Sequence, residues 1–133
     1  MPEVLVFSGP ALPLLDMAND MKPNDWNLHV KTNESSHEEI SEIAKIADFI
    51  LVFGHGVSDE VLHIAEKAKL IQLCSAGFDG VNVALAGELG IPVANNGGAN
   101  AIPVAEFAIT LALSTIRHLI VTDSDTRAGD WMR

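Results

Sequence analysis

The sequence predicts an α/β fold in which a parallel five-stranded sheet carries helices on both faces. Short apolar runs alternate with segments of helical periodicity along the chain. Each run is separated from the next by a crossover of helical length, which parallel strand pairing requires. The stretch from Trp26 to Val30 alternates apolar with polar residues, as a strand at a sheet edge does. These observations favour the strand order 2-1-3-4-5, which makes a flavodoxin-like three-layer sandwich.

The predicted strands and helices follow from local signals. Apolar runs that stop at turn residues predict strands at 3–8, 26–30, 49–53, 70–74 and from residue 91 to 94. Helices are predicted from Pro13, after a capping box at Ser35 or Ser36, after Ser58 and from Asn82 to Leu89. We expect His29 to be solvated at the sheet edge, and His37 and His63 to lie on helix surfaces rather than to act as ligands.

The last predicted helix, residues 101–121, is longer than the others and apolar on most sides. Such a helix needs a partner on more than one side, so we expect a homodimer or a domain-swapped oligomer formed through it. The run is too short and too interrupted to span a membrane. The residues after it, 122–133, are polar apart from Trp131 and Met132 and predict no further element.

Composition limits the possible partners. The chain of 133 residues is 48% apolar, which argues against disorder. Its formal charge of −10 disfavours nucleic acid and anionic membranes as partners. The single cysteine, Cys74, lies in an apolar run and is expected to be a buried core thiol, so neither a disulfide framework nor a thiolate–metal cluster is predicted. The N-terminus has no basic leader, and a cytoplasmic protein is expected.

Two chain reversals follow strands and are the candidate binding elements. Ligands of parallel sheets bind outside the carboxyl ends of the strands, which points to Ser75–Asp79 and Asn95–Asn100. Consecutive N–H groups in the first turn could hold an anionic group such as a carboxylate, and Gly77 would let the backbone come close. Alternatively, Gly77 and Gly80 merely allow a positive φ while Asp79 bonds backbone amides, and Asn100 is only a helix N-cap.

The loop Gly54-His55-Gly56 is a weaker candidate. It follows a strand and precedes a helix, like the first two glycines of a dinucleotide fingerprint, but it lacks the third glycine. Acidic residues in the following helix start would also repel a pyrophosphate. His55 could contact a substrate from the strand end or be a polar turn residue.

Residues 75–106, SAGFDGVNVALAGELGIPVANNGGANAIPVAE, resemble the signature region of the D-isomer-specific 2-hydroxyacid dehydrogenases. The shared features are a turn of the form x-G-x-D, a G-I-P-V-x-N strand and a V-A-E helix start. The resemblance extends over essentially all of this chain but only about the first two-fifths of a typical member. It implies a substrate-binding domain at 1–100, and at 101–133 an interdomain helix and the start of a linker to a missing Rossmann domain.

The resemblance also implies the chemistry, the interconversion of a small 2-hydroxy acid and its 2-oxo acid with NAD or NADP. In the family the backbone amides at the positions of Ala76 and Gly77, with Ser75 beside them, hold the substrate carboxylate. The residue matching Asn100 reaches the substrate in some members, and Gly54 and His55 lie at a pocket wall.

The family's catalytic arginine, glutamate and histidine come from the following domain and beyond. We therefore expect no catalytic, cofactor-binding or metal-binding residue in this chain, and no coenzyme binding by it alone. The alternative is a stand-alone flavodoxin-like binding or regulatory module without catalysis. The identity of the hydroxy acid and the choice between NAD and NADP stay open.

Overall fold

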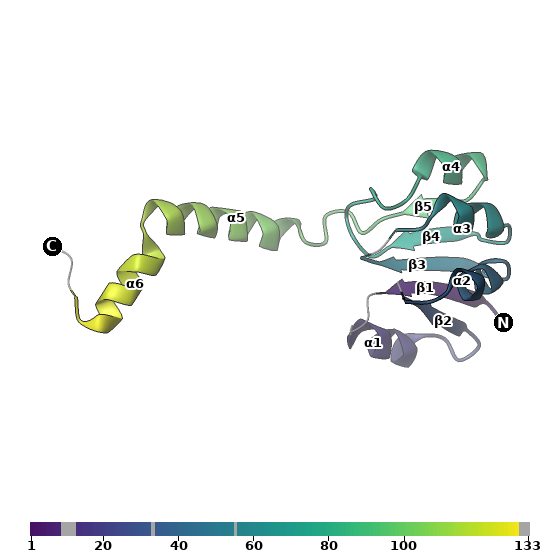
Figure 1. The fold of residues 1–133 in the computed structure, drawn as a ribbon, viewed down its shortest axis with the longest axis horizontal. Coiled ribbons are helices and arrows are strands. Elements are labelled where there is room, and N and C mark those ends of the chain that lie inside the picture. Colours follow the sequence, from purple (N-terminus) through teal and green to yellow (C-terminus); the bar gives the residue numbers. More distant parts are fainter. Residues whose placement is uncertain (9–12, 33, 55, 131–133) are drawn as a thin grey trace. The chain divides into compact units, whose positions relative to one another are not determined.

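The computed structural model describes residues 1–8, 13–32, 34–54 and 56–130. The chain divides into two compact units, Met1–Gly97 and Gly98–Arg133. In the first unit strands and helices alternate (Figure 1). Its strands are β1 (Glu3–Ser8), β2 (Asn27–Lys31), β3 (Phe49–Phe53), β4 (Leu70–Leu73) and β5 (Val93–Ala94), and its helices are α1 (Pro13–Met21), α2 (His37–Ala44), α3 (Asp59–Ile64) and α4 (Val83–Glu88).

All neighbouring strands pair in parallel, in the order β2-β1-β3-β4-β5, so the predicted sheet is confirmed. The chain moves outward from β1 to β2 and then returns past β1 to β3. Because β-α-β crossovers are right-handed, this reversal places α1 on one face of the sheet and α2, α3 and α4 on the other. In Figure 1, α2 and α3 cross the near face and α1 lies on the more distant side, beside β1 and β2.

The core lies between the sheet and the helices α2, α3 and α4. Along β3, Ile50 and Val52 point into this core and are buried, whereas the alternating Phe49, Leu51 and Phe53 are half-buried on the other face. The buried helix residues that meet the core are Ala44, Val61, Leu62 and Ala86. The apolar strand runs of the sequence therefore form the layer that positions the carboxyl ends of the strands.

Helix starts in the first unit follow the predicted capping signals. Ser36 makes the capping box with Glu39, whereas Ser35 instead accepts a hydrogen bond from the Thr32 N–H at 3.1 Å. Ser58 and Asn82 cap α3 and α4 by accepting from backbone N–H groups three residues ahead. These caps determine the residues at which α2, α3 and α4 begin.

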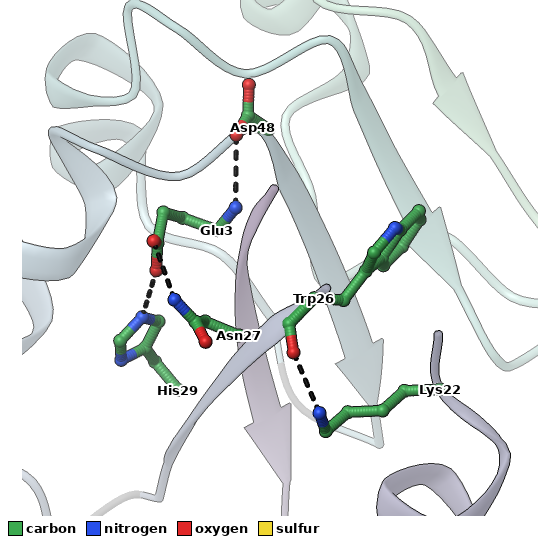
Figure 2. Close-up of polar contacts among 6 residues, drawn as sticks. All are labelled: Glu3, Lys22, Trp26, Asn27, His29 and Asp48. Carbon is green, nitrogen blue, oxygen red and sulfur yellow. Dashed lines mark hydrogen bonds and ion pairs between the residues drawn. The ribbon is translucent and has the colours of Figure 1, made fainter. Parts of the chain in front are cut away.

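A network of polar contacts joins the amino ends of the strands (Figure 2). The Glu3 carboxylate lies 2.6 Å from His29 Nε2 and accepts a hydrogen bond from Asn27 Nδ2 at 2.9 Å. The Glu3 N–H donates to Asp48 Oδ2 at 3.0 Å, and Lys69 Nζ donates to Asp48 Oδ1 at 2.7 Å. The prediction that His29 is solvated is wrong, because Glu3 of the neighbouring strand reaches it.

The edge strand also differs from its prediction. β2 begins at Asn27, and all its residues are half-buried, so the expected single wet face is not observed. Trp26 lies just before the strand and stacks on Phe49, with ring centroids 5.3 Å apart and planes 6° apart. Lys22 Nζ donates to the Trp26 carbonyl at 2.8 Å. The tryptophan therefore covers the half-buried face of β3 rather than pairing in the sheet.

The second unit contains two helices, α5 (Ala101–Ile116) and α6 (Leu119–Ala128), bent by 60° where they meet. The prediction of one helix from 101 to 121, with no element after it, is wrong. His118 adopts a left-handed conformation, with φ 50° and ψ 38°, which breaks the helix before it resumes. The apolar side chains of α5 are 52–72% exposed: Ile102, Val104, Phe107, Ile109, Leu111, Leu113 and Ile116.

Within the described ranges, no single helix has the length and apolar character needed to cross a membrane. Helices α5 and α6 meet that test only as a bent pair.

The amino-end network predicts acid sensitivity. Hydrogen bonds from His29 and then Asn27 lower the pKa of Glu3, and the Lys69 hydrogen bond, followed by the Glu3 N–H, lowers the pKa of Asp48. Both groups therefore add stability above their ordinary values of 4.5 and 3.8, and this contribution is lost as the pH falls through the lowered pKa values. Urea midpoints measured across this range should fall more steeply for the wild type than for Asp48→Asn.

Glu42→Gln is the control, since Glu42 is exposed on α2 and its carboxylate makes no hydrogen bond to another described residue. An Asp48→Asn protein with the wild-type pH dependence would contradict the assignment of acid sensitivity to this network.

Candidate functional site

The loops that follow β3 and β4 are held together at the carboxyl edge of the sheet. The Val57 N–H donates to the Gly80 carbonyl at 2.9 Å, and Val57 forms a parallel bridge with Val81. A Cβ added at Gly56 would lie 2.3 Å from the Gly80 oxygen, so only glycine permits this approach. The loop after β3 is therefore fixed against the turn that contains the predicted binding residues.

The turn itself, Ser75–Gly77, has each of its three carbonyl groups engaged. The Ser75 carbonyl accepts from the Asn96 N–H at 3.0 Å, and the Ala76 carbonyl accepts from Asn95 Nδ2 at 2.7 Å. The Gly77 carbonyl accepts from the Ser75 hydroxyl at 2.8 Å. All three turn residues are exposed. The turn is thus ordered by contacts from the loop after β5 as well as by its own serine.

A cavity of about 280 Å³ opens beside this turn. It brings together three of the predicted residues, Gly54, Ser75 and Gly77, while Ala76 lies in the same turn outside the lining. The complete lining is Gly54, Gly56, Leu73, Ser75, Gly77, Phe78, Asp79, Gly80 and Val81. No lysine or arginine stands among these described residues, so an anion would have to be held by neutral backbone groups.

The roles of two predicted residues stay predictions. Asn100 belongs to the second unit, where it occupies the N-cap position of α5 without a side-chain cap hydrogen bond to the described residues. The predicted residue His55 lies outside the described residues.

The alternative explanation for the glycines of the turn is wrong. The described glycines with positive φ are Gly54, Gly90, Gly98 and Gly129, so neither Gly77 nor Gly80 needs glycine for that reason. A Cβ at Gly77 would meet only Asp79 Oδ2, at 3.3 Å. The Asp79 carboxylate makes no hydrogen bond to any described residue, in contrast to the expected bond to backbone amides. The turn can therefore accept a side chain at position 77 at the cost of a small shift of Asp79.

Cys74 follows β4 and precedes the turn. It is half-buried, so the prediction of a core thiol overstated its burial. Burial raises the pKa of the thiol, which leaves it protonated at neutral pH and disfavours a role as a nucleophile.

The loop after β3 does not fit a dinucleotide, and the described residues include no cluster that could hold a metal ion. No group of three histidine, cysteine, aspartate or glutamate side chains among them could hold a metal. At the loop after β3, the space beside Gly56 is filled by the Gly80 carbonyl, and Asp59 and Glu60 begin the short helix α3. A pyrophosphate would meet negative charge there and find no room against the backbone.

The close approach of Gly56 predicts a large difference between two glycine-to-alanine substitutions. Gly56→Ala forces backbone atoms apart and should lower the free energy of unfolding by about 1–3 kcal/mol, as overpacking usually does. Gly87 lies in α4 with open space around it, so Gly87→Ala should stabilise the protein by roughly 0.5–1 kcal/mol. Urea unfolding of both variants measures the difference, and a Gly56→Ala protein as stable as the wild type would show that the two loops are not tightly held.

Comparisons with known proteins place this fold in a family. The family described as "D-isomer specific 2-hydroxyacid dehydrogenase, catalytic domain" matches residues 4–128. D-3-phosphoglycerate dehydrogenase of Archaeoglobus fulgidus is 33% identical over 124 residues, which are 92% of this chain and 24% of that protein. Hydroxypyruvate reductase of Thermotoga maritima is 29% identical over 120 residues, 90% of this chain and 39% of its own length.

A solved structure shows the same fold. The NAD⁺-bound 3-phosphoglycerate dehydrogenase of Entamoeba histolytica superposes with a TM-score of 0.68 at 22% identity, over 85% of this chain and 38% of that one. This chain therefore spans only about a quarter to two-fifths of the length of these proteins. The family match over residues 4–128 nevertheless shows that the chain belongs to the D-isomer-specific 2-hydroxyacid dehydrogenases.

Proposed function

We propose that this chain is the substrate-binding domain of an NAD(P)-dependent oxidoreductase that interconverts a 2-hydroxy acid and a 2-oxo acid. The observation that carries the proposal is the exposed turn Ser75–Gly77 beside its cavity, at the carboxyl end of a central strand in a chain of this family. Membership of the family supports an oxidoreductase over the alternative of a flavodoxin-like regulatory module.

The turn suits the carboxylate end of such a substrate. A 2-oxo acid must have its carboxylate fixed while the adjacent carbonyl reacts, and the N–H groups of Ala76 and Gly77 make no hydrogen bond to another described residue. In this proposal both N–H groups donate to the carboxylate. Gly54 and Gly77 place no side chain in the way, and Asn100 and His55 stay candidates for further contacts with the substrate.

Asp79 weakens the binding of an anion in the cavity. Its carboxylate lies in the lining and repels an anion, and no described lysine or arginine of the lining offsets it. A positive group from another part of the protein would therefore strengthen the binding of a 2-oxo acid beyond what this chain provides alone. The catalytic arginine that the family carries outside this domain is the group that we propose.

In this proposal the hydride donor is also held elsewhere, because the glycine loop after β3 does not fit a pyrophosphate. When bound, NAD(P) would supply the hydride for the carbonyl carbon. The share of each relative that this chain covers leaves room for a coenzyme domain. In this proposal the unit Gly98–Arg133 connects to that domain, and the enzyme works in the cytoplasm, where a protein with one half-buried cysteine needs no oxidising environment.

A titration tests the proposed site directly. Glyoxylate, the smallest 2-oxo acid, should shift the backbone amide resonances of Ala76 and Gly77 in this chain, whereas NADH should not bind at micromolar concentrations. A β-branched side chain at position 77 blocks the approach, and one charge-assisted hydrogen bond is worth roughly 1.5–3 kcal/mol, so Gly77→Val should weaken glyoxylate binding by about one to two decades.

Melting curves of Gly77→Val check that the variant stays folded. Amide shifts that occur away from the turn, or micromolar NADH binding by this chain, would refute the proposed division of substrate and coenzyme sites.

The exposed apolar side chains of α5 lead us to propose a second copy of this chain as its partner. Each large apolar side chain contributes about 1.5–3 kcal/mol when it is fully buried, so association through this helix is favoured. Light scattering should show a dimer, either side by side or domain-swapped, and Leu111→Glu or Ile116→Glu should shift it toward monomer. Thr126→Glu on α6 is the matched control. A wild-type chain that stays monomeric at high concentration would rule out this partner.

A further inference from the structure

The turn proposed to bind a carboxylate depends on the orientation of its N–H groups, and two hydrogen bonds to carbonyl groups determine that orientation. The C=O and N–H groups of one trans peptide unit point in opposite directions, and no described peptide bond is cis. Holding a carbonyl therefore also aims the N–H of the next residue. The Ser75 carbonyl aims the Ala76 N–H, and the Ala76 carbonyl aims the Gly77 N–H.

The two carbonyls are held in different ways. The Ser75 carbonyl receives the backbone N–H of Asn96, a bond that any residue except proline at that position could make. The Ala76 carbonyl receives the side-chain amide of Asn95, at 2.7 Å, from 19 residues further along the chain. The direction of the Gly77 N–H therefore depends on a particular side chain, whereas the direction of the Ala76 N–H depends on a backbone donor.

The surroundings of Asn95 leave its amide available for this bond. Asn95 directly follows β5, whose residues Val93 and Ala94 pair with β4. Its side chain borders a hollow of about 240 Å³, where the other lining residues are Phe78, Val83 and Val93. The side chains of these neighbours are apolar and offer no competing acceptor, and the residues from which Asn95 continues are paired in the sheet.

We infer that Asn95 is a positioning residue for substrate binding, which aims the Gly77 N–H at the carboxylate of a 2-oxo acid by holding the Ala76 carbonyl. This inference rests on the proposed function. It assigns to Asn95 no contact with the substrate. Without the amide of Asn95 the Ala76–Gly77 peptide unit is free to rotate, and the N–H no longer meets the ligand at a fixed angle, which weakens a directional bond.

The test compares two neighbouring asparagines in this 133-residue chain. Asn95→Leu removes the donor with little change of shape or charge. Asn96→Leu is the matched control, because Asn96 contributes its backbone N–H and its side chain bonds no described residue. Asn95→Gln keeps the donor on a longer arm, and Asn95→Ala repeats the deletion in case leucine disturbs the hollow.

Two measurements are needed. Residual dipolar couplings report the direction of the Gly77 N–H bond, which should change in Asn95→Leu and Asn95→Ala but not in Asn96→Leu. Glyoxylate titrations followed at the amides of Ala76 and Gly77 should give dissociation constants raised about tenfold in the two deletion variants, as expected for one misdirected hydrogen bond to a charged group. Asn95→Gln should recover part of this loss, and melting temperatures establish that each variant is folded.

The outcomes separate the two proposals. If glyoxylate binds the wild type at the turn but the folded Asn95 deletion variants bind it equally well, the positioning role is overturned and the proposed function stands. Lower melting temperatures with unchanged dissociation constants have the same meaning, since they show a purely structural role. If glyoxylate does not shift the amides of Ala76 and Gly77 in the wild type, the proposed function fails and this inference with it.

Discussion

The backbone contact between Gly56 and Gly80 is the constraint on which the carboxyl edge of the sheet depends. It lets the Val57 N–H reach the Gly80 carbonyl and so joins the loops that follow β3 and β4. The cavity beside the Ser75–Gly77 turn is bounded by both loops. On the other side, Asn95 and Asn96 fasten the same turn to the loop after β5. A turn held from both neighbouring strands is ordered before any ligand arrives, which lowers the entropy cost of binding.

The two edges of the sheet use different interactions. At the amino edge, charged side chains of Glu3, Asp48 and Lys69 join neighbouring strands, and their carboxyl pKa values are lowered as a result. At the carboxyl edge the contacts are made by backbone groups, a hydroxyl and an amide. Because the chain carries a formal charge of −10, a neutral turn is the kind of surface on which it can still accept an anion.

Much of the fold could be predicted from local patterns because local interactions determine it. The apolar runs set the bounds of β1 and β3, and the Ser36 capping box sets the start of α2. His29 was mispredicted because Glu3, its partner, is distant in sequence. The break at His118 gave no warning either, since neither glycine nor proline marks it and a left-handed histidine depends on its surroundings.

The candidate site was likewise predicted where local patterns or the family resemblance pointed to it, and missed where contacts between distant residues determine it. The resemblance to a family pointed to Ala76 and Gly77, and the strand ends pointed to the loop that starts at Asn95. Nothing local distinguished Asn95 from Asn96, because the difference between a side-chain donor and a backbone donor appears only when the two loops meet. The role of Gly56 was likewise hidden, since its glycine pattern suggested a phosphate loop while its actual neighbour is the Gly80 carbonyl.

The apolar side chains of helix α5 are distributed differently from those of the sheet. Its apolar residues are distributed around the helix, so no orientation against a single surface could bury all of them. A helix of this kind gains stability only when it is covered from more than one direction, and two copies of the same helix, each covering the other, meet that need with a self-complementary surface. Beyond the bend at His118, α6 begins with the exposed apolar residues Leu119, Ile120 and Val121 and continues with polar residues. Leu111 and Ile116 belong to α5, outside the first unit that contains the sheet, so a charge introduced at either position would act on the proposed association rather than on the core of the sheet.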